Sequence, residues 1–204
     1  MQIDSALTYA DVLRPTRTLP AWLYDVALVV AGSVLIAASA KVSFVLPRNL
    51  VPITGQTFAV LLIGALYGSR RGVATVLAYL AEGAAGIPVF AGKGAGVAYM
   101  MGPTGGYLIG FVVAAAIVGW LAQRGWDRRF GTTVVAMTLA TTAIFFCGML
   151  WPGYRMLPGG LWTAGILPFL PGAIIKIVLA AALLPSGWKL LAKLQAADRG
   201  SGVK

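Results

Sequence analysis

Residues 60–81 read VLLIGALYGSRRGVATVLAYLA, and this stretch decides the fold. Two strongly apolar runs meet at a short turn that contains Arg70 and Arg71. A helix that crosses the hydrocarbon core of a membrane needs about 20 residues, with a range of about 17–25. Extending both runs outward gives two spans, Ile53–Gly68 and Gly72–Phe90. The stretch therefore predicts a membrane hairpin with a basic turn at the membrane surface.

The rest of the chain has the same apolar character. Of its 204 residues, 59% are hydrophobic and 11% are charged, with a mean hydropathy of +0.84. These values lie outside the usual balance of a soluble domain, so we expect an all-α integral membrane protein. The six expected transmembrane helices are Ala21–Leu46, Ile53–Gly68, Gly72–Phe90, Gly102–Leu121, Thr132–Leu150 and Leu161–Leu184.

Basic residues are divided unequally between the two sides of this topology. Eleven lie in the termini and in the second-to-third and fourth-to-fifth connections, whereas three lie on the opposite side. Because cytoplasmic loops carry the excess of Lys and Arg, we expect both termini in the cytoplasm. The chain then divides into a cytoplasmic tail (1–20), a six-helix membrane domain (21–185) and a basic cytoplasmic tail (186–204). The longer loops lie outside, where a ligand would enter.

Missing residue types exclude many enzymes. The chain has no histidine, which removes imidazole bases, Ser-His triads and the usual zinc sites. The single cysteine, Cys147, lies in an apolar run and is interpreted as a packing residue. The glycine-rich stretch GPTGGYLIGF (102–111) lacks the Lys-Ser or Lys-Thr of a P-loop. The net charge of +10 is scattered and forms no nucleic-acid patch. We therefore expect a protein that is not an enzyme and that holds no metal or cofactor.

Two ionisable residues fall within the apolar segments, where they are costly and point to function. Glu82 follows VLAYLA, and Lys176 lies in FLPGAIIKIVLAA. If the sixth helix restarts near Pro171, Lys176 lies about a turn and a half inside it and faces a pocket open to the outside. The alternative is an ammonium that snorkels to the interface. In a pocket, this ammonium would suit a carboxylate ligand.

Uncharged polar residues lie near the same face of the membrane. They are Thr54, Gln56 and Thr57 in PITGQT, and Thr104 and Tyr107 in GPTGGY. Their donors and acceptors could bind an amide-like or urea-like ligand. Thr104 has the alternative role of capping the start of the fourth span.

Small residues recur at a spacing of four in the first span. Ala27 and Ala31 form one such pair, and Ser33 and Ala37 form another. Residues at this spacing share a helix face and allow another helix to approach closely. They serve either packing inside this chain or docking of a partner membrane protein, and both interpretations remain open.

Four motifs in this order resemble the BioY family, the biotin-binding S components of energy-coupling factor transporters. The resemblance covers about residues 25–185, and the motifs are specific together rather than singly. They read VPITGQTFAVLLIGALYG (51–68), LAEGAAGIPVFAGKGAG (80–96), GPTGGYLIGF (102–111) and LPFLPGAIIKIVLAA (167–181).

The resemblance implies a six-helix S-component bundle in a bacterial or archaeal cell membrane. Such a protein captures biotin from outside and associates with a membrane coupling subunit and two ATP-binding-cassette ATPases. Its docking face would be that of Ala27, Ala31 and Ala37. Its ligand residues would be Lys176, Thr54, Gln56, Glu82, Thr104, Tyr107, Gly105 and Gly106.

The chain departs from the family's pattern at one position. The family often has Asp where this chain has Ala173, in the turn before Lys176. That carboxylate is expected to help bind the polar end of the ligand, and Glu82 and Gln56 are the candidates to compensate. The alternatives to biotin capture are an S component for another anionic vitamin, an intramembrane enzyme and a membrane scaffold.

Overall fold

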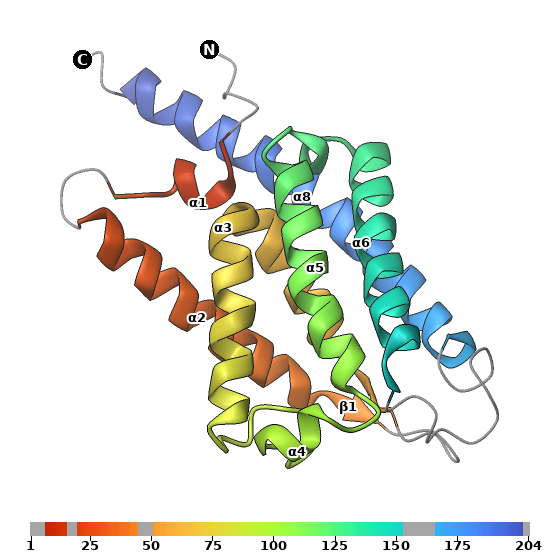
Figure 1. The fold of residues 1–204 in the computed structure, drawn as a ribbon. Coiled ribbons are helices and arrows are strands. Elements are labelled where there is room, and N and C mark those ends of the chain that lie inside the picture. The colour runs from red at the N-terminus through yellow and green to blue at the C-terminus, as the bar shows by residue number, and fades with distance from the viewer. Residues whose placement is uncertain (1–6, 16–19, 45–50, 153–165, 202–204) are drawn as a thin grey trace.

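The computed structural model describes residues 7–15, 20–44, 51–152 and 166–201. Nearly all of this part of the chain is helical, and the long helices form one bundle (Figure 1). The elements are α1 (Tyr9–Val12), α2 (Ala21–Lys41), β1 (Ser43–Phe44), β2 (Ile53–Thr54), α3 (Gln56–Ala84), α4 (Gly96–Met100), α5 (Gly105–Ala122), the 3-10 helix η1 (Trp126–Arg128), α6 (Phe130–Leu150), the 3-10 helix η3 (Leu167–Phe169) and α8 (Leu170–Ser201).

Five helices, α2, α3, α5, α6 and α8, are long and apolar enough to cross a membrane, which confirms the expected all-α membrane class. Of these, α3 consists of two arms joined at Gly68, whose φ of 80° and ψ of 174° are open almost only to glycine. A Cβ built on Gly72 would lie only 3.0 Å from the Gly64 Cα. In a continuous helix these two residues would be about 12 Å apart along the axis. The arms of α3 therefore form the hairpin predicted for the second and third spans.

The second arm of α3 is shorter than predicted. Its expected end is Phe90, but the helix ends at Ala84. Gly86 follows with a φ of 93°, and Pro88 has no N–H with which to continue the helix. The residues after Ala84 form a loop that carries Phe90 over the interior of the bundle.

The last helix begins near Pro171, as considered for Lys176. Its predicted start at Leu161, like the predicted end of the first span at Leu46, lies outside the described residues. The turn η3 precedes α8, which begins at Leu170 with Pro171 in its first turn, where a missing N–H costs little. Lys176 therefore lies about two turns into α8.

Close contacts across glycines place α5 at the centre of the bundle, and it is the most buried of the five long helices. A Cβ on Gly110 of α5 would lie 2.8 Å from the Cα of Ile144 in α6. A Cβ on Gly64 of α3 would lie 2.5 Å from Val118 of α5. Small residues thus allow the packing that holds membrane helices together. By contrast, α2 and α8 lie at the periphery.

The short helix α1 ties together one end of the bundle. The Tyr9 hydroxyl donates to the carbonyl of Leu184 in α8, and its ring centroid lies 4.2 Å from that of Trp188. The indole of Trp188 donates to Asp127 of η1 at 2.6 Å. Burial raises the pKa of this Asp127 carboxyl to about 6. Helix α1 and the C-terminal part of α8 thus lie at the same end of the bundle. An even number of membrane-spanning helices requires this arrangement.

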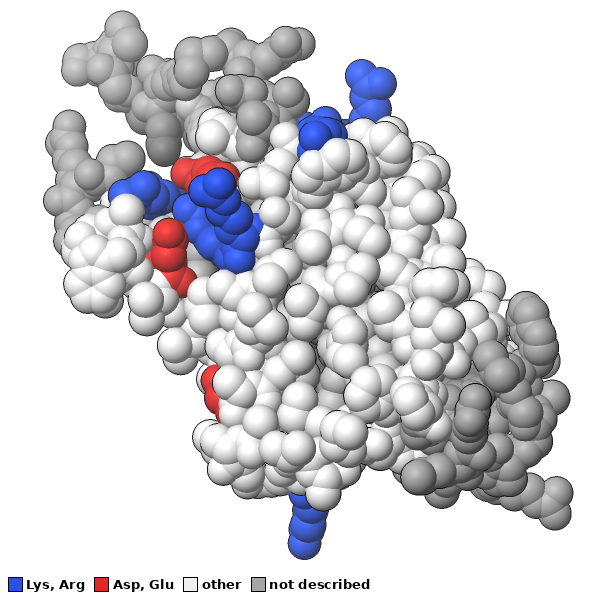
Figure 2. Space-filling view, viewed as in Figure 1, with Lys and Arg blue, Asp and Glu red and all other residues white. Residues whose placement is uncertain are grey.

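The hairpin turn of α3 lies at this same end. Arg71 pairs with Asp11 of α1 at 2.6 Å and with Asp25 of α2 at 2.7 Å. Figure 2 shows most of the visible Lys and Arg side chains around this end and one at the opposite end. The end with more Lys and Arg is the end predicted to face the cytoplasm. The domain boundaries at residues 20/21 and 185/186 stay a prediction, and α8 runs on through Pro185 to Ser201.

Candidate ligand-binding site

A cavity opens at the end of the bundle opposite α1. Its walls come from the β2–α3 segment, the loop after α3, and helices α4, α5, α6 and α8. It has about 760 Å³ of empty space, counting its mouth. This space includes open solvent at the mouth, so the enclosed part of the cavity is smaller.

A short β ribbon sets one wall of the cavity. Strands β1 and β2 are antiparallel, with Ser43 opposite Thr54, and the backbone N–H of Gly55 donates to Val42 at 3.0 Å. These bonds fix the turn that leads into α3. Gln56 begins the helix and is buried, and its side-chain amide donates to the hydroxyl of Tyr79. The carbonyl oxygen of this amide remains able to accept a hydrogen bond from a ligand.

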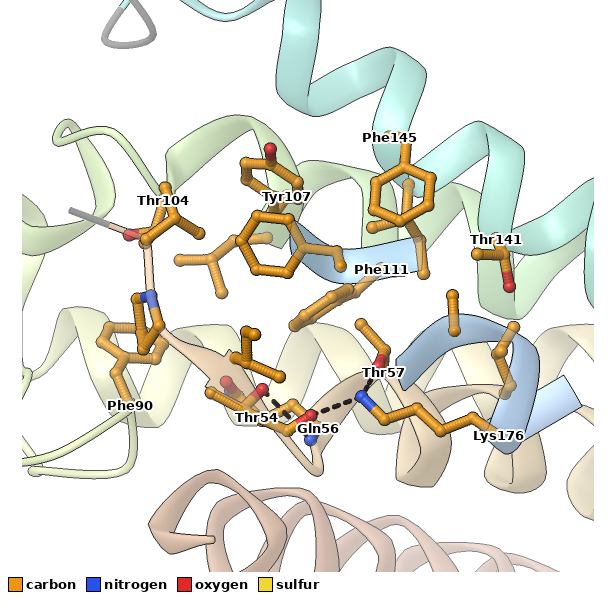
Figure 3. A pocket seen from close by; sticks show the side chains of 18 of the residues that line it. Thr54, Gln56, Thr57, Phe90, Thr104, Tyr107, Phe111, Thr141, Phe145 and Lys176 are labelled. Carbon is orange, nitrogen blue, oxygen red and sulfur yellow. Dashed lines mark hydrogen bonds between the residues drawn. The ribbon is translucent and has the colours of Figure 1, made fainter. Parts of the chain in front are cut away.

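Lys176 reaches from α8 to this wall (Figure 3). Its ammonium donates to the carbonyl of Thr54 at 2.5 Å and to the hydroxyl of Thr57 at 2.7 Å. The side chain therefore turns toward the cavity wall, where its ammonium has two partners. An ammonium has three donors, so one is left for a ligand. No residue that lines the cavity is acidic, and this part of the described structure thus favours an anionic group.

Aromatic side chains form the rest of the enclosure. The rings of Phe90 and Tyr99 stack at 5.0 Å, and Phe169 lies 6.0 Å from Tyr107 and 6.4 Å from Phe145. Such apolar walls with a few polar groups are typical of sites for flat organic ligands.

Five of the eight predicted ligand residues come together here. Lys176, Thr54, Gln56, Thr104 and Tyr107 all line the cavity. Thr104 occupies the N-cap position of α5 but makes no side-chain capping bond, so its side chain is not committed to the alternative role.

The other three predicted residues do not line the cavity. An added Cβ on Gly105 would clash with the carbonyl oxygen of Met100 in α4, and one on Gly106 would lie 2.5 Å from the carbonyl oxygen of Cys147 in α6. These glycines let the start of α5 lie close to α4 and α6. Glu82 accepts a hydrogen bond from Ser33 of α2 at 2.8 Å. This carboxylate joins α2 to α3 and is not placed to compensate for Ala173, which does line the cavity.

Several cavity residues were not predicted. Phe90, Phe111, Phe145 and Phe169 stand in apolar runs, where a sequence pattern cannot separate a cavity wall from ordinary packing. Thr141 was also missed, because a single threonine within a membrane helix carries no distinctive signal.

Lys41, at the end of α2, holds the loop that carries Phe90. Its ammonium donates to the carbonyls of Pro88, Phe90 and Gly92 at 2.5, 3.0 and 2.8 Å. All three donors are therefore used. We call this set of bonds the Lys41 clip, and it fixes one wall of the cavity from a separate helix.

The predicted docking face on α2 is partly open. Ala27 and Ala31 are exposed, whereas Ala37 is half-buried and packs against the core. The first two can therefore meet lipid or a partner, and the third also contributes to packing within the chain.

Comparisons with known proteins give one consistent result. The BioY family model matches residues 11–193. The chain is 35% identical over 156 residues to the probable biotin transporter BioY of Pyrococcus horikoshii, covering 76% of this chain and 91% of the relative. It is 33% identical to the biotin transporter BioY of Thermotoga maritima, with coverages of 76% and 90%. It is 34% identical to that of Rhodobacter capsulatus, with coverages of 63% and 74%.

A solved structure has a similar fold. It is the S-component for biotin from an ECF-type ABC transporter, with a TM-score of 0.71 over 84% of this chain and 95% of that chain. The two sequences are 23% identical, so this likeness concerns the arrangement of the helices.

Proposed function

Because this chain belongs to the BioY family, we propose that it is the biotin-capture subunit of a vitamin uptake transporter in the cell membrane, with its cavity facing outside and both termini in the cytoplasm. The observation that carries the proposal is the Lys176 ammonium, which reaches an aromatic cavity with no carboxylate among its described lining residues. Biotin is a carboxylate with an apolar chain and a polar ureido ring, so it matches both features.

In this proposal the two ends of biotin contact different groups. Its carboxylate accepts the remaining donor of Lys176. Its apolar part packs among the aromatic rings, and its ureido ring uses polar groups away from Lys176, such as the side chain of Thr104 (Figure 3). A charged hydrogen bond in such an enclosed place is stronger than a neutral one.

The required affinity is physically reasonable. A nanomolar complex corresponds to about −12.3 kcal/mol. Divided among the roughly 16 non-hydrogen atoms of biotin, this is about −0.8 kcal/mol per atom, below the ceiling of about −1.5. Such efficiency requires near-complete enclosure, which the aromatic walls support.

The direct test is equilibrium binding of radiolabelled biotin to the purified protein in detergent. We expect saturable binding at submicromolar ligand. Absence of saturable binding at micromolar biotin would refute the proposal. Displacement by another anionic vitamin at lower concentration than by biotin would assign the site to that vitamin instead.

The proposed transporter also needs a membrane coupling subunit and two ATPases, because this chain has no nucleotide motif. Liposomes that contain this protein alone should not accumulate biotin against a gradient, whereas liposomes with the complete transporter should do so when ATP is present. Accumulation by the isolated chain would contradict this requirement.

Ala31→Leu should reduce ATP-dependent uptake by about tenfold or more while leaving biotin affinity within about twofold. Its exposed position suits close helix docking, which a larger side chain prevents. Uptake into liposomes and biotin binding in detergent are measured on the same preparation. Ala182→Leu, an equally exposed change on α8, is the control. Normal uptake by Ala31→Leu would remove this residue from the partner face.

The Lys41 clip predicts slow ligand release. Lys41→Met keeps the apolar stem but removes the three donors that hold the loop of Phe90. Biotin should then dissociate about tenfold faster or more, because three lost hydrogen bonds of about 0.5–1.5 kcal/mol each amount to at least about 1.5 kcal/mol, and 1.4 kcal/mol corresponds to about tenfold. Chase of bound radiolabel with unlabelled biotin measures the rate. An unchanged rate would show that the loop closes without the clip.

A further inference from the structure

One hydroxyl in the cavity wall has no partner in the described structure. Thr141 lies on α6, about nine-tenths buried, and its Oγ1 atom is inaccessible to water and makes no hydrogen bond. Buried polar groups are normally hydrogen-bonded, so an unpartnered one calls for an explanation. A ligand that completes the bond is one such explanation, because Thr141 lines the cavity.

The surroundings of Thr141 leave few other polar groups for a ligand. The other cavity residues from α6, Ile144 and Phe145, are apolar. On α8, Ala173 presents only a methyl group one turn before Lys176. Figure 3 shows Thr141 on the same side of the view as the backbone of Lys176, whereas the Lys176 ammonium reaches back to Thr57 in the middle of the view.

The polar groups on the facing wall already have partners. Thr57 accepts a hydrogen bond from Lys176, and Thr54 accepts one from the backbone N–H of Gln56 at 3.3 Å. The Gln56 side chain donates to Tyr79. Of the buried lining side chains that the structure describes, Thr141 is the one whose polar atom has no hydrogen bond at all.

We propose that the Thr141 hydroxyl donates a hydrogen bond to the ligand carboxylate that Lys176 binds, and that it thereby helps determine specificity for the acid. This inference rests on the proposed function and adds a second contact to the same end of biotin. A hydroxyl has one donor and a rotatable O–H, so it can turn from the helix surface to an incoming oxygen.

The experiment compares Thr141→Val, which has the same shape without the donor, with Thr141→Ser, which keeps the donor. Thr141→Val should weaken biotin binding by about 10- to 100-fold, the range for losing a hydrogen bond to a charged group. It should weaken binding of biotin methyl ester by less than about threefold, because the ester carries no charge. Thr141→Ser should stay within about threefold of the wild type.

Thermal unfolding of the ligand-free protein should show no loss of stability, although the affinity for biotin falls. Replacing an unpartnered buried hydroxyl by a methyl group should leave the midpoint unchanged or raise it. Thr142→Val, the same change at the exposed neighbouring position, is the control and should affect neither quantity. If Thr141→Val cannot be purified in folded form, Thr141→Ala replaces it in the same comparison.

The outcomes separate this inference from the proposed function. No biotin binding by the wild type would refute the proposed function. Normal wild-type binding with unchanged affinity in Thr141→Val would overturn the inference alone. Equal losses for biotin and its methyl ester, or a lowered unfolding midpoint that accounts for the loss, would also overturn it.

Discussion

Lys176→Ala is expected to weaken biotin binding by about 30-fold to several thousand-fold. In the proposed complex, this substitution leaves a buried carboxylate without its cation, which costs about 2–5 kcal/mol, and each 1.4 kcal/mol corresponds to about tenfold in affinity. The protein should still fold, because among the described residues the ammonium bonds only to Thr54 and Thr57 on the facing wall. Equilibrium binding of radiolabelled biotin measures the change.

Two controls identify the cause of this loss. Wild type should bind biotin methyl ester more weakly than biotin, and Lys176→Ala should lose most of that preference. Lys189→Ala removes an exposed lysine from the same helix and should leave affinity unchanged. Equal loss for acid and ester would show that Lys176 supports the wall or contacts the ring end of the ligand, and the proposed orientation of biotin would then be wrong.

Gly68→Val should destabilise the hairpin on which the fold depends. A β-branched residue is strongly disfavoured at a φ of 80°, and such strain costs about 1–3 kcal/mol. The new side chain would also begin 3.0 Å from Thr8 and 3.1 Å from Gln123. For a chain of this size, the strain lowers the unfolding midpoint by about 2–12 °C.

The matched control is Gly131→Val, at a position in α6 where an added Cβ has no neighbour within 4 Å. Its unfolding midpoint should remain within about 2 °C of the wild type, since it introduces neither strain nor a clash. Thermal unfolding of both variants in the same detergent gives the comparison. A midpoint for Gly68→Val equal to that of the control would mean that the turn can adopt another conformation.

The course of the chain was predictable because its signals are local. The basic turn at Arg70 and Arg71 separates two apolar runs, and the structure places a hairpin there. The helix ends were less accurate. The apolar composition extends the predicted third span to Phe90, whereas the helix ends earlier, before Gly86 and Pro88. Phe90 therefore lies in a loop and lines the cavity.

The candidate site was predictable where a residue was chemically unusual for its surroundings. Lys176 stands out in an apolar segment, and it does reach the cavity. Glu82 stands out in the same way, yet it accepts a hydrogen bond from Ser33 between two helices. Both uses satisfy a charge within a membrane protein, and only the direction of each side chain separates them. The direction of Thr141 was beyond the reach of the sequence for the same reason.

The helix α2 extends over 21 residues, about 30 Å, and carries the exposed alanines along its length and the Lys41 clip at its end. The helix therefore links the exposed alanines directly to the cavity wall. If a docked partner tilts α2 and strains the bonds to the Phe90 loop, docking and ligand retention share one free energy of coupling. Such coupling would be reciprocal: any factor by which docking lowered biotin affinity would equal the factor by which bound biotin lowered affinity for the partner.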